Sequence, residues 1–322
     1  MMRFWNSAWA KTIVLFLGLS GLIGCTGRPH PIAAQGISSS LAFIPPLATL
    51  TPKAATPAIT PSPVPTVPST TAPTPGEVTA TAELDLTPEI ILGQNAYTTS
   101  LQVSDDAGLS RTVDVHYLLY LPGDYGRDSP YQWPLIIFLH GAGERGDDPG
   151  VITRYSIPAF LTNTLDFPFV VLSPQSPQDD WWSSQSAILD ALLNQIQARY
   201  AVDPKRIFLT GQSMGGFGTW AMALRYPARF AAIAPVASGW DFTNEFVPAR
   251  ICDLKNVPIW VFHGALDQSV LPDQVTAMVQ VLQNCGGAVR LTLYPDADHL
   301  GSSNRAYADP KLYEWLAAQH LP

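Results

Sequence analysis

The sequence predicts an α/β fold, in which helices cover both faces of a mostly parallel central sheet. Apolar runs alternate with helical patterns along the last two thirds of the chain, an order typical of parallel strands joined by right-handed crossovers. Residues 134–139 are continuously apolar, as expected of a strand buried on both faces. Residues 98–103 and 111–121 flank the turn sequence Asp-Asp-Ala-Gly at 105–108, which predicts an antiparallel pair before the parallel strands.

The remaining elements follow from the same patterns. Further strands are expected at 169–172, 206–209, 231–236, 259–262 and 290–294. Helices are expected at 186–200, where apolar residues recur with a helical period, and at 219–226, 274–282 and 313–319. This order places the compact domain at 87–322.

Composition limits the classes of partner. The chain has 322 residues, of which 47% are hydrophobic, enough to build a sizeable core. Its net charge of −8 and the lack of a basic cluster argue against a nucleic-acid partner. Neither observation restricts a small neutral substrate.

Residues 1–24 have the features of a bacterial lipoprotein signal peptide. Arg3 and Lys11 supply positive charge before the apolar run 12–23, which is too short to span a bilayer of roughly 30 Å. The run ends in Leu-Ile-Gly-Cys, which resembles a lipobox with Cys25 as the lipidated residue. An ordinary secretion signal and an uncleaved anchor are the alternatives. In each case we expect an extracytoplasmic protein. In the lipoprotein case, lipid on Cys25 holds the protein at a membrane surface.

Residues 25–86 differ in composition from the rest of the chain. They are rich in Pro, Thr, Ala and Ser, a composition that forms neither helices nor sheets. We expect an extended stalk, partly in the polyproline II conformation, between the membrane and the domain.

The motif Gly-Gln-Ser-Met-Gly at 211–215 is the strongest chemical signal. It follows the apolar strand ending at residue 209 and precedes the helical pattern at 219–226, the strand–turn–helix context of a nucleophile elbow. Small residues are needed two positions on either side of the serine, and Gly211 and Gly215 meet that need. We therefore expect Ser213 to be a nucleophile, rather than an incidental serine in a glycine-rich turn.

A serine nucleophile needs a base, and elimination among six histidines leaves His299. It follows the last predicted strand, at the carboxyl edge of the sheet where ligands bind in such folds. Of the other five, His30 lies in the stalk, His116 within a strand and His320 near the C-terminus. His140 and His263 each end a strand just before a glycine, where a histidine more often shapes a turn than takes up protons.

The third member should orient the imidazole through its Nδ1–H. Asp267 follows the strand before that of His299 by a short turn, which makes it the preferred candidate. Asp296 and Asp298 are rivals that lie close in sequence to His299, and Asp241 is a further rival. The order Ser213, Asp267, His299 is the chain order of α/β-hydrolases.

From about residue 117 to the C-terminus the chain resembles the α/β-hydrolase superfamily. Within it, the chain is similar to the secreted branch of dienelactone hydrolases, carboxylesterases and peptidase-like proteins. The resemblance rests on PLIIFLHGAGERG, IFLTGQSMGGFGTW, VPIWVFHGALD and LTLYPDADH. It implies a hydrolase that requires no cofactor, with oxyanion donors at the N–H groups of Met214 and Ala142. Gly143 is the alternative to Ala142. The chain departs from many relatives after His299, where Leu300 and Gly301 stand.

Three further pairs of residues complete the expected site. Trp181 and Trp182 follow a strand at the same edge and form either a substrate platform or packing over the rim. Arg145 either binds a substrate carboxylate or pairs with Glu144 or a neighbouring loop. Cys252 and Cys285 are expected to form a disulfide in an oxidising compartment, with two separate thiols as the alternative. The separation of Cys252 and Cys285 from any His or carboxylate cluster argues against a metal site.

These observations predict a serine hydrolase that cleaves carboxylic esters through an acyl-enzyme. The expected substrates are small-molecule or polysaccharide-linked esters, and the expected state is a monomer. Two alternatives remain: a peptidase of the same fold, and a non-catalytic lipoprotein binding module.

Overall fold

The computed structural model describes residues 90–104, 108–126, 130–240 and 247–322, all within one compact unit. Several expectations concern other residues and lie outside this part of the chain. They are the signal peptide at 1–24, Cys25, the stalk at 25–86, most of the turn at 105–108 and the rival acid Asp241. The predicted domain boundary at residue 87 also precedes the first described residue.

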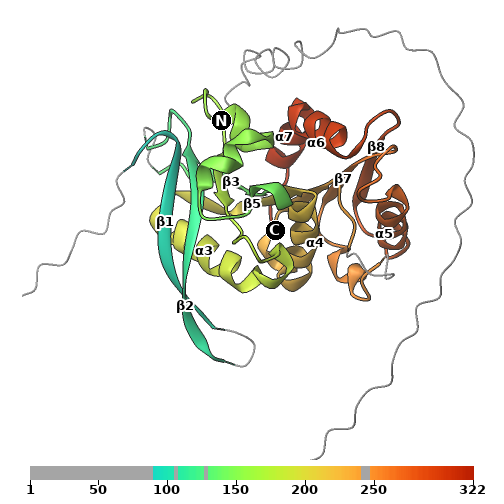
Figure 1. Cartoon of the computed structure of the whole chain (residues 1–322), viewed down its shortest axis with the longest axis horizontal. Helices are drawn as coiled ribbons and strands as arrows, with labels where there is room; N and C mark the ends of the chain where they lie inside the picture. The colour runs from blue at the N-terminus through green and yellow to red at the C-terminus, as the bar shows by residue number, and fades with distance from the viewer. Residues whose placement is uncertain (1–89, 105–107, 127–129, 241–246) are drawn as a thin grey trace, which may run out of the picture. The chain divides into compact units, whose positions relative to one another are not determined.

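An eight-stranded sheet forms the centre of this unit, with strand order β1-β2-β4-β3-β5-β6-β7-β8 (Figure 1). The strands are β1 (Gly93–Ser104), β2 (Ser110–Leu121), β3 (Trp133–Leu139), β4 (Val170–Pro174), β5 (Val202–Gln212), β6 (Ala232–Val236), β7 (Ile259–Gly264) and β8 (Val289–Tyr294). β2 pairs antiparallel with both β1 and β4, and every other pair is parallel. The predicted mostly parallel sheet with an antiparallel N-terminal pair is therefore confirmed.

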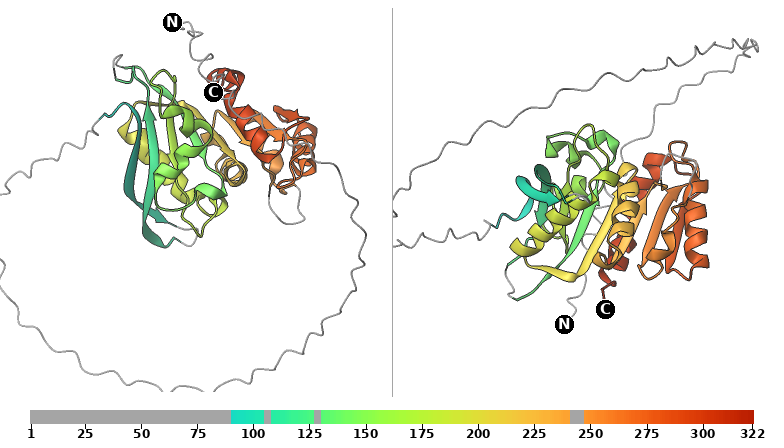
Figure 2. Two further views of the ribbon diagram at one scale, coloured as in Figure 1. Left: turned by 45° about the horizontal axis from the view of Figure 1, so that its top comes forward. Right: turned by 90° about the horizontal axis from the view of Figure 1, so that it is seen from below.

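Helices cover both faces of the sheet (Figures 1 and 2). On one face lie α3 (Ser186–Arg199), α4 (Met214–Arg225) and α5 (Pro272–Asn284). On the other lie α2 (Ser156–Leu161), α6 (His299–Ala308) and α7 (Pro310–Ala317). Short 3-10 turns occur at η2 (Ala142–Glu144), η3 (Pro149–Arg154), η4 (Trp182–Ser184), η5 (Pro227–Arg229) and η6 (Ile251–Leu254).

Strand β3 shows why the buried strands read as continuous apolar runs. Successive side chains of a strand point to opposite faces of the sheet. Leu135 and Ile137 accordingly pack in the core on the α3–α5 side, whereas Ile136 and Phe138 pack in the core on the α2, α6 and α7 side. Because both faces are covered by helices, no position of this strand is left for a polar side chain.

Two helices were not predicted. Helix α2 has only six residues and contains Pro158, so it has no recognisable period. Helix α6 begins His-Leu-Gly-Ser-Ser-Asn, which contains weak helix formers. It is stabilised at its start by the Asp298 carboxylate, which accepts a hydrogen bond from Gly301 N–H at 2.7 Å. His299, expected in a loop, is therefore the first residue of a helix.

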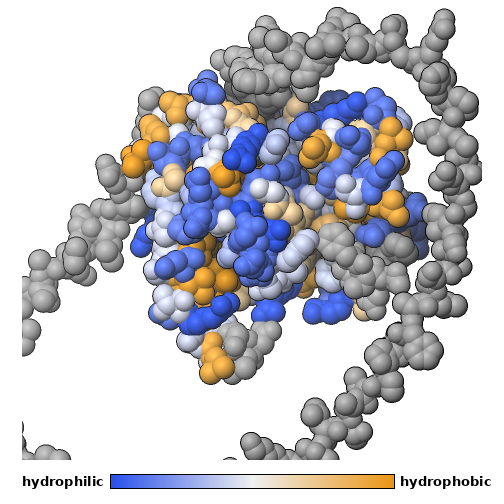
Figure 3. Space-filling model, viewed as in Figure 1, coloured by the Kyte–Doolittle hydropathy of each residue, from blue (hydrophilic) through white to orange (hydrophobic). Residues whose placement is uncertain are grey.

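In the view of Figure 3, hydrophilic side chains cover most of the described surface, and apolar side chains gather in separate patches. No helix among the described residues is both long enough and apolar enough to cross a membrane.

Candidate active site

Ser213 lies in a strained turn between β5 and α4. Its φ of 53° is in the left-handed region, which is uncommon for a residue with a side chain. The turn is possible because its neighbours are glycines: a Cβ on Gly215 would overlap the carbonyl of Leu139, and one on Gly211 would overlap the carbonyl of Gly215. Ser213 N–H donates to Val236 O at 3.0 Å, which fastens the turn to β6. The predicted strand–turn–helix context is present.

The structure brings Ser213, His299 and Asp267 together. The Ser213 hydroxyl donates to His299 Nε2 at 2.8 Å, and His299 Nδ1–H donates to Asp267 Oδ2 at 2.7 Å. The three residues follow the carboxyl ends of β5, β8 and β7, which meet at one edge of the parallel sheet. The His299 side chain is 18% exposed and that of Asp267 is buried, so solvent reaches the imidazole but not the carboxylate.

Asp267 is held as a carboxylate by several donors. Its Oδ1 accepts hydrogen bonds from Ser269 N–H and Val270 N–H, each at 2.9 Å. Burial raises the pKa of Asp267, but the hydrogen bonds from His299 and Val270 outweigh burial, and the net pKa is lowered. The rival acids near His299 have other partners: Asp296 pairs with Arg305 at 2.6 Å, and Asp298 caps α6.

The two remaining histidines at strand ends are buried within turns, as expected. His263 Nε2–H donates to Val270 O at 2.9 Å, and His140 Nδ1–H donates to Gly141 O at 2.6 Å. Burial lowers the pKa of both rings, that of His140 to about 4, so both are neutral near pH 7.

The predicted oxyanion donors lie on two segments beside Ser213. Met214 is the first residue of α4, and Ala142 is the first residue of η2, directly after β3 and His140–Gly141. Among residues 90–104, 108–126, 130–240 and 247–322, neither N–H has a hydrogen-bond acceptor. N–H groups at the first turn of a helix have no acceptor within the helix and are available to an anion.

The two adjacent tryptophans have different surroundings. Trp181 is 39% exposed, and the Arg145 guanidinium lies 5.6 Å from its ring centroid. Trp182 is buried, with its Nε1–H donating to His140 O at 2.9 Å. Of the two interpretations, packing therefore describes Trp182, because its indole is buried and its N–H is used inside the protein.

Arg145 pairs with the neighbouring loop rather than with Glu144. Besides its contact with Trp181, its Nε–H donates to Ala142 O at 3.0 Å. The Glu144 carboxyl is buried, and burial raises its pKa. Its Oε2 lies 3.9 Å from His140 Nδ1.

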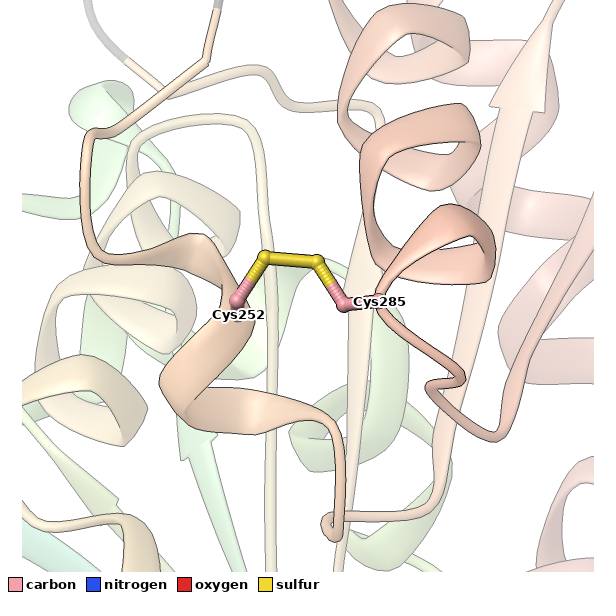
Figure 4. The surroundings of a disulfide bond; sticks show 2 residues. All are labelled: Cys252 and Cys285. Carbon is pink, nitrogen blue, oxygen red and sulfur yellow. A yellow bond between two sulfur atoms is a disulfide. The ribbon is translucent and has the colours of Figure 1, made fainter.

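Cys252 in η6 and Cys285 after α5 are joined as a disulfide, with 5.7 Å between their Cα atoms (Figure 4). This agrees with the predicted pairing. Within the described part of the chain, no group of three or more His, Cys, Asp or Glu side chains is arranged to hold a metal ion.

Sequence reasoning missed the residues that hold the segment after β3. Gln175, directly after β4, donates from Nε2 to the carbonyls of both Glu144 and Asp148 at 2.9 Å. Ser156, the first residue of α2, has a φ of 57° and donates its hydroxyl to Gln212 Oε1, next to Ser213, at 2.6 Å. Gln175 and Ser156 stand in no motif, so only their contacts identify them.

Residues 110–308 match the model of a protein family described as "Putative esterase". The chain belongs to this esterase family. Its fold, with helices on both faces of the mostly parallel sheet, is that of the α/β-hydrolases. A solved structure titled as a thermostable esterase is 30% identical, with a TM-score of 0.57 over 69% of this chain and 63% of that one.

Three curated relatives differ in the activity that their names state. A "Probable carboxylesterase" of Oryza sativa subsp. japonica is 30% identical over 56% of this chain and 76% of the relative. A "Probable feruloyl esterase C" of Aspergillus niger is 27% identical over 47% of this chain and 58% of the relative. The "Dipeptidyl peptidase family member 1" of Caenorhabditis elegans is 24% identical over 67% of this chain, which spans only 30% of that relative's length.

Proposed function

We propose that this protein is a serine esterase that hydrolyses carboxylic esters through an acyl-enzyme. Ser213 attacks the ester carbonyl while His299 takes the hydroxyl proton at Nε2. His299 then gives this proton to the leaving alcohol. In the second half of the reaction, water attacks the acyl-enzyme while His299 takes a proton from it. His299 returns that proton to the Ser213 oxygen as the acid is released. The N–H groups of Met214 and Ala142 stabilise the tetrahedral oxyanion.

The observation that carries this proposal is the pair of hydrogen bonds through His299. The 2.8 Å contact places the base on the nucleophile, and the 2.7 Å contact to Asp267 fixes the tautomer that leaves Nε2 free to accept a proton. The lowered pKa of Asp267 supports its role, because an ionised carboxylate stabilises the imidazolium formed during the reaction.

The proposed substrates are small-molecule or polysaccharide-linked esters. The relative named as a feruloyl esterase supports an ester whose acid is aromatic. The half-exposed pair of Trp181 and Arg145 lies on segments that follow β4 and β3, next to the Ala142 donor, and offers a flat surface and a positive charge to such a substrate. The charge suits an ester that also bears a carboxylate.

The site of action proposed for this esterase is outside the cytoplasm. The lipobox ending at Cys25 and the proline-rich segment to residue 86 support a lipid-anchored domain held at a distance from a membrane. An esterase tethered in this way meets its substrate at the cell surface or in the periplasm.

A fluorophosphonate probe tests the nucleophile. Wild-type protein should be labelled, and Ser213→Ala should not, because the probe reacts with an activated serine. Equal labelling of both proteins would assign the reaction to another residue.

A panel of p-nitrophenyl acyl esters, feruloyl esters, acetylated xylan and peptide amides then defines the substrate. Hydrolysis of the amides alone would favour the peptidase, which the relative named as a dipeptidyl peptidase family member supports. If none of these substrates is hydrolysed and the probe does not label the protein, the non-catalytic binding module is the remaining interpretation.

A further inference from the structure

The peptide unit between Gly141 and Ala142 joins an anchored carbonyl to the N–H proposed as an oxyanion donor. His140 Nδ1–H donates to Gly141 O at 2.6 Å. Because a peptide unit is planar and trans, its C=O and N–H point in opposite directions. The hydrogen bond that fixes the Gly141 carbonyl therefore also fixes the direction of the Ala142 N–H.

The His140 ring is itself held in one orientation and one tautomer. Ser176 N–H donates to His140 Nε2 at 3.0 Å, so this nitrogen is an acceptor and the proton stays on Nδ1. The ring is 1% exposed and meets Trp182 edge to face, with 5.0 Å between the ring centroids. Trp182 also donates to the carbonyl of His140 at 2.9 Å. The ring is therefore unable to turn without breaking several contacts.

A second buried side chain holds Ser176. Gln185, directly before α3, donates from Nε2 to Ser176 Oγ at 2.7 Å and is 3% exposed. Ser176 O in turn accepts from Gly146 N–H at 2.9 Å, at the far end of the segment that carries Ala142. A continuous chain of contacts thus runs from the start of α3, through the loop after β4, to the Gly141–Ala142 peptide.

We propose that Gln185, Ser176 and His140 form a positioning relay that aims the Ala142 N–H at the oxyanion formed on Ser213. This inference rests on the proposed esterase function. The relay acts through the peptide and not on the substrate directly. Its loss should weaken binding of the transition state while leaving ground-state binding unchanged, so kcat and kcat/KM should fall together at constant KM.

Two substitutions of His140 separate this role from packing. His140→Asn places an amide N–H near the position of Nδ1. His140→Gln places its amide near Nε2 and leaves Gly141 O with only the longer hydrogen bond from Glu144 N–H, at 3.4 Å. We expect kcat to fall about 100-fold in His140→Gln and less than about 10-fold in His140→Asn, against the 100- to 1000-fold typical of a lost oxyanion donor. The inhibition constant of a trifluoromethyl ketone, whose hemiketal oxygen occupies the oxyanion position, should rise by the same factor as kcat falls. Equal kcat values in two folded variants would overturn the relay.

The outer end of the relay, Gln185, has a matched control on the adjoining helix α3. Gln185→Met removes the donor to Ser176 at nearly constant volume, and Gln195→Met removes a hydrogen bond to Thr99 elsewhere on α3. We expect a kcat loss of about 10-fold only in Gln185→Met, a fraction of the effect of a lost oxyanion donor. A similar loss in both variants would show that α3 stability, not the relay, controls turnover.

A spectroscopic measurement tests the relay without enzymatic activity. The nitrogen shifts of the His140 imidazole near pH 7 should report the Nδ1–H tautomer in wild type, and this tautomer should weaken in Gln185→Met but persist in Gln195→Met. The Nε2–H tautomer in wild type would refute the relay. By contrast, a wild type that carries the Nδ1–H tautomer but is not labelled by a fluorophosphonate would refute the esterase function alone.

Discussion

His263 and Asp267 lie close together in the turn after β7, with 3.4 Å between His263 Nε2 and Asp267 Oδ2, the oxygen that also accepts from His299. Oδ1 of Asp267 accepts from Ser269 N–H and Val270 N–H, so the hydrogen bonds to both oxygens of this carboxylate come from N–H donors. These surroundings stabilise a carboxylate, because both of its oxygens accept hydrogen bonds. They disfavour an amide, because its nitrogen is a donor.

Asp267→Asn should reduce kcat on the order of 10⁴-fold. The new amide nitrogen must face either His299 Nδ1–H or the N–H groups of Ser269 and Val270, so it either reverses the tautomer of His299 or disturbs the turn. Steady-state hydrolysis of a p-nitrophenyl ester measures the effect. Asp296→Asn is the control and should retain activity, because Asp296 is an exposed partner of Arg305. Near-normal activity of Asp267→Asn would move the orienting role to another acid.

The free energy of unfolding should depend on pH through His140. Burial lowers the pKa of this ring from its ordinary 6.5 to about 4, with Arg145 contributing in the same direction and the hydrogen bond to Gly141 opposing it. Between these two pH values the unfolded chain binds a proton at this ring and the folded protein does not. Stability is therefore lost as pH falls from about 6.5 to about 4, by on the order of 3 kcal/mol.

Urea unfolding at pH 7 and pH 4.5 measures this loss, and comparison with His140→Asn isolates it from other groups such as Glu144 and His263. The wild type should lose more stability than the variant over this interval. An identical loss in both proteins would show that another group is responsible.

The neighbouring tryptophans should respond differently to truncation. Trp182→Ala removes a fully buried indole and its hydrogen bond to His140, and should destabilise the protein by about 3–5 kcal/mol. Trp181→Ala should change stability by less than about 0.5 kcal/mol and raise KM for feruloyl esters. Thermal unfolding and ester kinetics on both variants test the pair. A large loss of stability in Trp181→Ala, with KM unchanged, would assign that ring to packing.

The disulfide should contribute substantially to stability. Cys252 and Cys285 are 33 residues apart, and closing a loop of that length stabilises a protein by about 3–4 kcal/mol in the chain-entropy model. In the double variant Cys252→Ala, Cys285→Ala, the free energy of unfolding should fall by that amount, and the midpoint of urea unfolding should shift to a lower concentration. Non-reducing mass spectrometry should find the two cysteines linked in protein made in an oxidising compartment. Two free thiols in that protein would rule out the bond.

Residues whose signal is local could be predicted from the sequence. The elbow at Ser213 depends on two glycines within the same turn, and strands such as β3 show their double burial directly in their composition. The positions of Asp267 and His299 followed from strand order, because parallel strands end at one edge of the sheet.

Features set by contacts between distant segments could not be predicted. The burial of Trp182 depends on the carbonyl of His140, which is 42 residues away. Helix α6 has little helical pattern of its own and forms because Asp298 caps it and its buried side chains pack against the sheet. Gln175, Ser176 and Gln185 lack a motif, so nothing in the chain distinguished them from ordinary loop residues.

The covalent link between Cys252 and Cys285 has a consequence for proteolysis of this protein. The segment it encloses contains Asp267 and two exposed leucines, Leu266 and Leu271, on a turn that a protease can reach. A single nick there would leave both fragments attached. The cleaved protein should therefore run as one band on a non-reducing gel and as two after reduction, with its two halves still held around the same sheet.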